Sequence, residues 1–391
     1  MGEQNFIRPL LTVVATTRND DHGGNLVNRM QLFVNGLLEQ CRRHQLDAEL
    51  VLVEWNPPED KPRLSEALTW PVKDGPCTVR IIEVSPEVHQ RFSQRDQLPL
   101  FQMLAKNVGI RRARGRFILA TNIDILFSDE IIRFFASGKM KPSRMYRVDR
   151  FDVPANVPGD LSLDQQLEFC RNNVIRRHAR RRTPDLAYNG DRVFVTDRLS
   201  WEWRDWRGWP LTIEVRGLVG GGRSYLRNRW PEYKVQLEAL QDRLFPNSLP
   251  RHFTFQLPMN LHTNASGDFT MLDAAHWNTL RGYPEFLGSC MHLDALLCYM
   301  AHHSGAREQV LTDPMRIYHI DHGGGGEAAE GDGAALYYRL DAGGVSRLKT
   351  EEIYDWAIEM RRKGEPIIFN SENWGLAGDD LPETVISPAG K

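Results

Sequence analysis

Short apolar runs alternate with amphipathic stretches along the first 140 residues of the chain. Apolar runs that end in polar or turn-forming residues predict buried strands at 11–15, 50–53, 79–84 and 117–120. Between these runs, apolar residues recur at three- and four-residue steps, most clearly from Leu26 to Cys41 and near 98–114, and predict helices. This alternation is typical of an α/β fold with a mostly parallel sheet that is flanked by helices.

Polar residues follow three of these predicted strands at the point where each strand ends. They occupy the segments Thr16–Asp21, Glu54–Asn56 and Asn122–Asp124. Right-handed crossovers bring the carboxyl ends of parallel strands to one edge of a sheet, and the ligands of such sheets bind at that edge. The sequence therefore predicts a binding site where the three segments meet.

The stretch from about residue 155 to 255 differs from both of its flanks. It has no clear hydrophobic period, but it contains an arginine-rich run at 176–182, five tryptophans between Trp201 and Trp230, and a glycine run at 220–222. We interpret it as a helical insertion or lid whose aromatic residues pack over the sheet. A surface for an anionic or sugar-like acceptor is the functional alternative, because Trp and Arg stack on flat groups and Arg binds carboxylates and phosphates.

Composition narrows the class of protein further. With 49 basic and 51 acidic residues the net charge is −2, which disfavours a nucleic-acid partner. The sequence shows neither a membrane-spanning apolar run nor a secretory leader, and its five widely spaced cysteines predict reduced thiols, so a cytoplasmic location is expected. An arginine-rich surface would still allow peripheral attachment to a membrane.

The polar pair after the fourth predicted strand carries the clearest chemical signal. Asn122 and Asp124 are two residues apart, so on an extended strand they would share a face. Asp124 would then bind a hard divalent cation, because Mg²⁺ and Mn²⁺ are held by one or two carboxylates together with phosphate oxygens. A capped turn at the end of the strand is the structural alternative.

The surroundings of this pair resemble the GT-A fold glycosyltransferases that use nucleotide sugars, of the inverting, family 2-like kind. The segment 104–124 is similar to the family's run "arN-G-a-G-yi-(L/F)-D-x-D", with Asn122 where the family has an aspartate. The segments 267–272, 282–285 and 292–294, ending in His-Leu-Asp, resemble its later motifs. A late histidine segment, Tyr318–His322, completes the resemblance, which leaves out the central insertion.

This resemblance implies a donor site and a metal site. It assigns the nucleotide to the residues Thr16, Arg18, Glu54, Asn107 and Asn122. It assigns an Mn²⁺ or Mg²⁺ ion to Asp124 together with His319 or His322, although a pair of histidines at this spacing is also common in capped turns. Neutralisation of the leaving diphosphate would then be the largest catalytic contribution.

The resemblance also implies a general base and acceptor contacts. Asp294, at the start of a predicted helix, would take the proton of the attacking hydroxyl, and the displacement would invert the anomeric centre. Stabilisation of the helix dipole is the structural alternative for this residue. Asp268 and Glu285 would bind sugar hydroxyls, and Trp277 would pack beside the sugar or in the core.

Together these expectations describe a metal-dependent enzyme. It would move a sugar from a nucleoside-diphosphate donor, with UDP as the expected nucleotide, to a hydroxylated acceptor that is a carbohydrate, a lipid-linked molecule or a small molecule. Residues 1–150 would bind the donor, 151–260 would form the insertion, and 261–391 would carry the acceptor and catalytic part. A sugar nucleotidyltransferase of the same fold, or a non-catalytic carbohydrate- or nucleic-acid-binding protein, are the alternatives.

Overall fold

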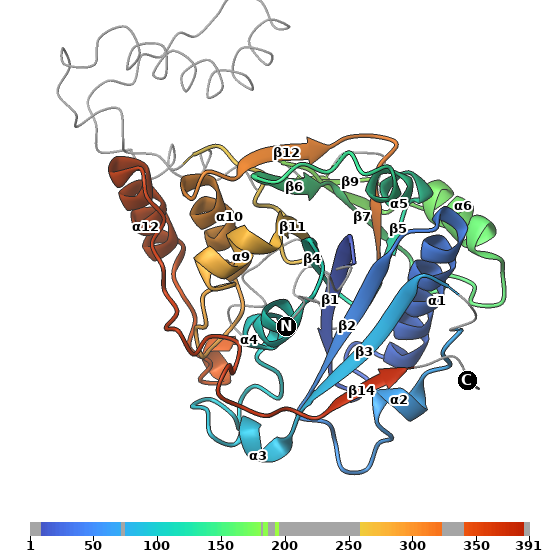
Figure 1. The fold of residues 1–391 in the computed structure, drawn as a ribbon, viewed down its shortest axis with the longest axis horizontal. Coiled ribbons are helices and arrows are strands. Elements are labelled where there is room, and N and C mark those ends of the chain that lie inside the picture. The colour runs from blue at the N-terminus through green and yellow to red at the C-terminus, as the bar shows by residue number, and fades with distance from the viewer. Residues whose placement is uncertain are drawn as a thin grey trace, which may run out of the picture.

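The computed structural model describes residues 9–71, 75–180, 183–186, 192–194, 259–322 and 340–386. Most of the tryptophan-rich part of the predicted insertion, its glycine run and the glycine-rich loop after His322 lie outside these residues. Figure 1 shows a large sheet with helices on both of its faces. The predicted α/β class is therefore confirmed.

The first half of the chain forms the centre of the large sheet. Its strands are β1 (Leu11–Thr17), β2 (Ala48–Trp55), β3 (Cys77–Val84), β4 (Phe117–Thr121) and β6 (Arg144–Val148). Later segments add β11 (Phe269–Asp273), β12 (Arg307–Leu311) and β14 (Glu383–Ile386). The spatial order is β12-β6-β11-β4-β1-β2-β3-β14.

This sheet is mixed rather than purely parallel. The central pairs β4–β1, β1–β2 and β2–β3 are parallel, as is β6–β12. β11 runs antiparallel to both β4 and β6, and β14 runs antiparallel to β3. Because β6 pairs with strands from the last third of the chain, the large sheet crosses the expected boundaries at residues 150 and 260. The three-part division of the chain stays a prediction.

Helices cover the two faces of the large sheet with separate apolar cores. One face packs against α1 (Leu26–His44) and α5 (Asp129–Ala136), through side chains such as Phe33 and Phe135. The helices of the other face, seen together in Figure 1, are α4 (Gln102–Arg112), α9 (Ala274–Leu280), α10 (Leu293–His303) and α12 (Thr350–Lys363). Two single-turn helices, α2 (Leu64–Ala67) and α3 (Pro86–His89), lie in the connections.

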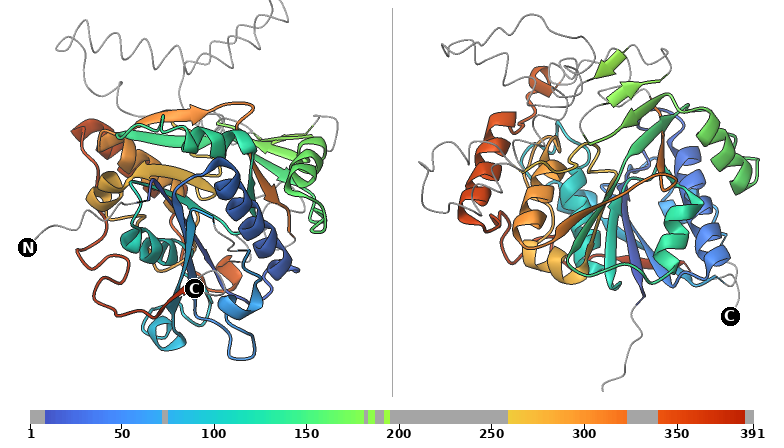
Figure 2. Two further views of the ribbon diagram at one scale, coloured as in Figure 1. Left: turned by 45° about the vertical axis from the view of Figure 1, so that its right-hand side comes forward. Right: turned by 90° about the horizontal axis from the view of Figure 1, so that it is seen from above.

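A second, smaller sheet was not expected from the sequence. It comprises β5 (Ile125–Phe127), β7 (Arg150–Val153), β8 (Arg176–His178), β9 (Thr183–Asp185), β10 (Arg192–Phe194) and β13 (Ile317–Ile320). Its order is β10-β9-β8-β7-β13-β5, and Figure 2 shows it from two further directions. The helix α6 (Leu163–Asn172) packs on it through Leu167 and Cys170. The start of the predicted helical insertion therefore combines the helix α6 with four short strands.

None of the described helices is both long enough and apolar enough to cross a lipid bilayer.

The helix α1 ends in three basic residues, Arg42, Arg43 and His44. Their charges complement the negative end of the helix dipole.

Candidate metal and donor-binding site

The polar pair Asn122 and Asp124 lies in the turn that links β4 to β5. The expectation that the two residues lie on one extended strand is therefore wrong. In this turn their side chains meet different partners: Asn122 contacts Asp268, and Asp124 contacts His319 and His322. The turn separates two chemical environments that the sequence pattern had placed together.

Asp124, His319 and His322 form one cluster, although almost 200 residues separate the aspartate from the histidines. The Nε2 atoms of His319 and His322 lie 3.7 Å and 3.4 Å from Oδ2 of Asp124. One potential ligand atom from each of the three residues lies within 4.8 Å of the others. Three ligand atoms at this spacing are close enough to share one ion.

The second sheet brings this cluster together. β13 lies between β7 and β5, and its register places His319 opposite both Asp152 and Ile125. The backbone N–H of Ile320 donates to the carbonyl of Asp124 at 3.0 Å. A strand from the end of the chain therefore aligns the histidine beside the turn that carries Asp124.

The charges around the cluster keep the carboxylate of Asp124 ionised at neutral pH. Burial would raise the pKa of Asp124, but His319, His322 and Arg29 lower it to about 2. Its buried Oδ1 atom has no hydrogen-bond partner among the described residues. Buried polar atoms are normally satisfied, and one carboxylate with two imidazoles is a common ligand set for divalent metals. The residues of this site therefore fit a divalent cation.

The loop between β1 and α1 supports His322. The ring of His322 packs so closely on Gly23 that a Cβ atom there would lie 2.5 Å from Nδ1 of the histidine. The buried guanidinium of Arg29 holds the loop by donating to the carbonyls of His22 and Gly24, both at 2.6 Å. The loop that follows the first polar segment thus packs against the cluster of Asp124, His319 and His322.

A second polar network begins at Asn122. Its carbonyl oxygen accepts from the ammonium of Lys106 at 2.8 Å, and its amide donates to Asp268 at 2.5 Å. The other oxygen of Asp268 accepts from Arg150 at 2.7 Å. Both the carbonyl and the amino group of the Asn122 side chain are therefore hydrogen-bonded within the protein. The carboxylate of Asp268 is held by the amide of Asn122 and the guanidinium of Arg150.

Sequence reasoning missed Lys106. It is fully buried, and burial lowers its pKa, while the charges of Asp268, Asp294 and Asp124 oppose that shift. Its ammonium also donates to the carbonyl of Gly267 at 2.7 Å. The sequence does carry a signal for this residue: a lysine among apolar residues of a predicted helix. If such a lysine is buried, its ammonium must find hydrogen-bond acceptors inside the protein.

Asp294 lies at the start of α10 and faces the same loop. Its Oδ2 atom accepts from the hydroxyl of Ser266 and from the backbone N–H of Gly267, both at 2.7 Å. Its Oδ1 atom makes no hydrogen bond within the described residues, and the side chain is only partly buried. One carboxylate oxygen of Asp294 is thus anchored by the loop that precedes β11.

The residues predicted to hold the nucleotide base lie at the ends of β1 and β2. The hydroxyl of Thr16 donates to the carbonyl of Val53 at 3.1 Å, and Nε of Arg18 donates to the carbonyl of Asn56 at 2.6 Å. Glu54 is buried and accepts the backbone N–H of Leu64, at 3.1 Å and 3.2 Å to its two oxygens. Burial raises the pKa of Glu54 to about 7.

Three further predicted residues lie inside the protein, away from these clusters. The amide of fully buried Asn107 binds the backbone of Tyr283 and the carboxylate of Glu285. Trp277 has no exposed surface and donates to the carbonyl of Ile118 at 3.0 Å. Their placement corresponds to the packing alternative for Trp277, and the Asn107–Glu285 contact ties α4 to the segment after α9.

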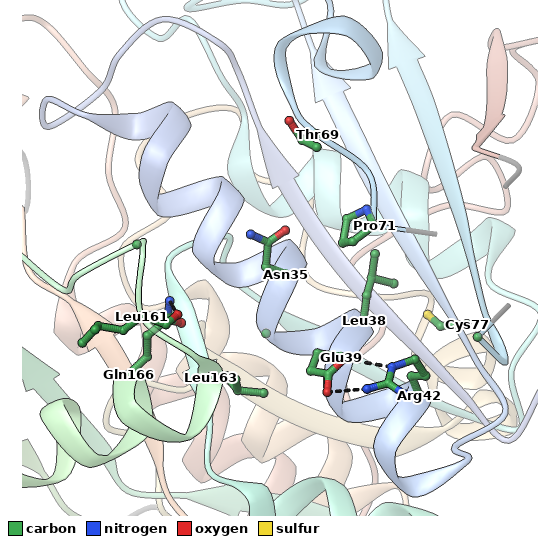
Figure 3. Close-up of a pocket in the computed structure, with 13 residues that line it drawn as sticks. Asn35, Leu38, Glu39, Arg42, Thr69, Pro71, Cys77, Leu161, Leu163 and Gln166 are labelled. Carbon is green, nitrogen blue, oxygen red and sulfur yellow. Dashed lines mark hydrogen bonds and ion pairs between the residues drawn. The ribbon is translucent and has the colours of Figure 1, made fainter. Parts of the chain in front are cut away.

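A surface pocket of about 460 Å³ lies elsewhere, between α1 and two loops. Figure 3 shows Asn35 and Leu38 of α1 facing Pro71 and Leu161 there, with Glu39 and Arg42 paired to each other. None of the predicted site residues lines it. The pocket and the metal cluster are therefore distinct features of the molecule.

Comparisons with known proteins give limited information. No protein-family profile matches the sequence, and no curated protein matches it significantly. Among solved structures, a crystal structure of S. aureus TarS is 12% identical, with a TM-score of 0.36, and the match covers 80% of this chain and 36% of that chain. A structure of S. aureus TarS 1–349 is also 12% identical, with a TM-score of 0.37 and coverage of 90% and 71%.

This chain thus spans about a third of the first TarS chain. At this identity and these TM-scores the similarity says nothing about activity. The mixed sheet flanked by helices is consistent with the glycosyltransferase-like fold that the sequence resemblance implies.

Proposed function

We propose that this protein is a metal-dependent glycosyltransferase that uses a nucleoside-diphosphate sugar, with a UDP-sugar as the first donor to test. The observation that carries the proposal is the convergence of Asp124, His319 and His322 beside the carboxyl ends of β1 and β4, with one buried carboxylate oxygen that has no hydrogen-bond partner in the described part of the chain. In sheets of this kind, ligands bind at that edge.

Asp124, His319 and His322 would hold the ion. Two imidazoles and one carboxylate suit transition metals, so Mn²⁺ is the ion to test before Mg²⁺. The cation, when bound, supplies positive charge that stabilises the leaving diphosphate. Thr16 and Arg18, at the end of β1, would contact the nucleotide, and the ordered loop that contains Gly23 would link them to His322.

Asp294 would act as the general base on the acceptor hydroxyl. Its hydrogen bonds from Ser266 and Gly267 orient the carboxylate, and the unanchored Oδ1 atom would receive the proton as the new glycosidic bond forms. Asp268, which Asn122 and Arg150 hold in place, would accept hydrogen bonds from hydroxyl groups of the transferred sugar. The acceptor would be a hydroxylated carbohydrate, lipid-linked molecule or small molecule, and no nucleic acid is expected.

A screen of nucleotide sugars tests the proposal directly. Thermal unfolding is followed for each donor with and without Mn²⁺, because a ligand of the native state raises the unfolding temperature. The donor that stabilises the protein only with Mn²⁺ is then incubated with candidate acceptors. Release of the nucleoside diphosphate supports the proposal, whereas release of pyrophosphate would indicate a nucleotidyltransferase. Sugar binding with neither metal dependence nor turnover would indicate a non-catalytic protein.

A further inference from the structure

We propose that Asp152 is a positioning residue for the metal cluster: its carboxylate holds Nδ1 of His319, so that Nε2 of the same ring faces the ion. The inference rests on the proposed function, because it assumes that His319 is a ligand. It concerns a residue of β7 that no sequence motif indicates.

The register of the second sheet places Asp152 beside His319. β7 and β13 are parallel neighbours, and Asp152 and His319 are aligned residues in that pair. Oδ1 of Asp152 lies 3.2 Å from Nδ1 of His319, while the opposite nitrogen, Nε2, lies 3.7 Å from Oδ2 of Asp124. The imidazole therefore stands between two carboxylates, and only one of them belongs to the candidate ligand set.

Asp152 is itself held in place. Its side chain is 3% exposed, and its two oxygens lie 2.8 Å from Nε of Arg150 and 2.9 Å from Nε2 of His178. The neighbouring strand β8, which carries His178, therefore fixes the carboxylate from the side opposite β13. The hydrogen bonds that Oδ2 makes with Arg150 and His178 restrain the carboxylate, and Oδ1 is left facing the His319 ring.

The imidazole of a metal-binding histidine usually donates its second ring N–H to a carboxylate or another acceptor. This hydrogen bond selects the tautomer, fixes the orientation of the ring and makes the other nitrogen a stronger metal ligand. Asp152 has the position and the fixed orientation for this role. The side chain of Arg150 also reaches Asp268, so the same guanidinium links the carboxylate behind His319 to the residue proposed to bind the sugar.

The chain offers a matched control in the same region. Asp149 lies 2.8 Å from Nε2 of His262 and 2.6 Å from Arg177, so it is also an aspartate that is paired with histidine and arginine side chains. Neither Asp149 nor His262 belongs to the three-residue cluster. Substitutions at Asp149 therefore remove a similar charge pair without touching His319.

The test measures Mn²⁺ binding in the absence of nucleotide, by isothermal titration calorimetry and by the electron paramagnetic resonance signal of free Mn²⁺. The variants are Asp152→Ala, Asp152→Asn, Asp149→Ala and His319→Ala, each checked for folding by circular dichroism. Asp152→Ala is expected to weaken Mn²⁺ binding about 10–100-fold, the usual effect of losing such a partner. Asp152→Asn, which keeps an oxygen for Nδ1–H, should lose less than about tenfold, and Asp149→Ala should stay within about twofold.

The tautomer of His319 provides a second readout that a purely structural role would not change. In metal-free protein labelled with ¹⁵N-histidine, the His319 signals are assigned by their loss in His319→Ala. At a pH where the ring is neutral, the wild-type protein should carry the proton on Nδ1, and Asp152→Ala should shift the population toward Nε2–H. If Asp152→Ala does not fold, Asp152→Asn is read by the same two measurements and should retain the Nδ1–H form.

The outcomes separate the two proposals. Unchanged Mn²⁺ binding in His319→Ala would contradict the metal site itself. Loss of binding in His319→Ala with unchanged binding in the Asp152 variants overturns the role of Asp152 alone. Equal losses in Asp152→Ala and Asp149→Ala, with an unchanged His319 tautomer, also overturn it, because they indicate a general effect on folding.

Discussion

Two groups of predicted site residues lie at the carboxyl edge of the large sheet, and they differ in how their polar atoms are used. Thr16, Arg18 and Glu54 direct hydrogen bonds into neighbouring backbone, so they shape the loops after β1 and β2. In the metal cluster, the atoms of Asp124 and His322 point toward one another, and Oδ1 of Asp124 has no partner among the described residues. The polar groups of the first set are satisfied inside the protein, whereas the buried Oδ1 atom of Asp124 keeps an acceptor that a bound ion or water would satisfy.

The largest expected effect comes from removing the carboxylate of the metal cluster. Asp124→Ala should abolish detectable Mn²⁺ binding by calorimetry and reduce nucleoside-diphosphate release about 10³-fold, because diphosphate stabilisation would be lost. Asp129→Ala is the control, since it breaks another aspartate–histidine pair, with His44 at 2.8 Å, at the start of α5. Metal-dependent turnover that survives in Asp124→Ala would falsify the metal assignment.

Asp294→Asn should have the next largest effect. Asparagine can still accept from Ser266 and Gly267, so the loop should keep its shape, but it cannot take a proton from the acceptor. We expect turnover to fall about 10²–10⁴-fold while the donor still raises the unfolding temperature in the presence of Mn²⁺. A fully active variant would show that the base lies elsewhere.

Two neighbouring glycines test whether the β1–α1 loop positions His322. Gly23 and Gly24 have φ angles of +72° and +74°, so alanine costs about 1 kcal/mol of backbone strain at either position. Only at Gly23 would the new Cβ meet the His322 ring, since nothing lies within 4 Å of a Cβ at Gly24.

Gly23→Ala should therefore weaken Mn²⁺ binding about tenfold, equivalent to about 1.4 kcal/mol, while Gly24→Ala leaves it almost unchanged. Calorimetric titration with Mn²⁺ gives the affinity of each variant and tests this difference. Equal affinities in the two variants would mean that His322 does not depend on this packing.

The last effect concerns folding stability rather than metal binding, and it arises from Glu54, in the group whose hydrogen bonds are internal. Its pKa of about 7 lies above the ordinary value of 4.5, so the stability it contributes is complete below pH 4.5 and is lost as the pH rises through 7. Glu54→Gln removes this titration but keeps an acceptor for Leu64. At pH 8 the variant should be more stable by about 2–3 kcal/mol, measured by urea unfolding across pH 4–8. If the free energy of unfolding depends on pH in the same way in the variant and in the wild type, this account is contradicted.

Much of the first half of the fold could be predicted because its signals are local. The apolar runs at 11–15 and 50–53 became β1 and β2, and the amphipathic stretch from Leu26 became α1. The helix α6 was missed although Ser162 and Gln165 form a capping box, a pattern that is readable in sequence. The Trp- and Arg-rich composition of the surrounding stretch obscured that signal.

The second sheet could not be predicted in the same way. Its strands are three or four residues long, and β13 pairs with segments more than 160 residues earlier in the chain. Strands this short have no reliable hydrophobic period, and their pairing depends on contacts that are far apart in sequence. Asp152, which lies on one of these strands, was therefore missed as a member of the site.

The sequence alone determined the α/β class, the central strands and the chemical types available at their ends, because hydrophobic periodicity and turn residues act over a few neighbours. The family resemblance implied Asp124 together with His319 or His322 as metal ligands. Only the tertiary structure decided that these three side chains lie close together. It also decided that Asn122 binds Lys106 and Asp268 instead. The contact of Asp152 with Nδ1 of His319 likewise depends on the tertiary structure. Those outcomes depend on the register of strands from distant parts of the chain, and a shift of one residue in a strand sends its side chains to the opposite face.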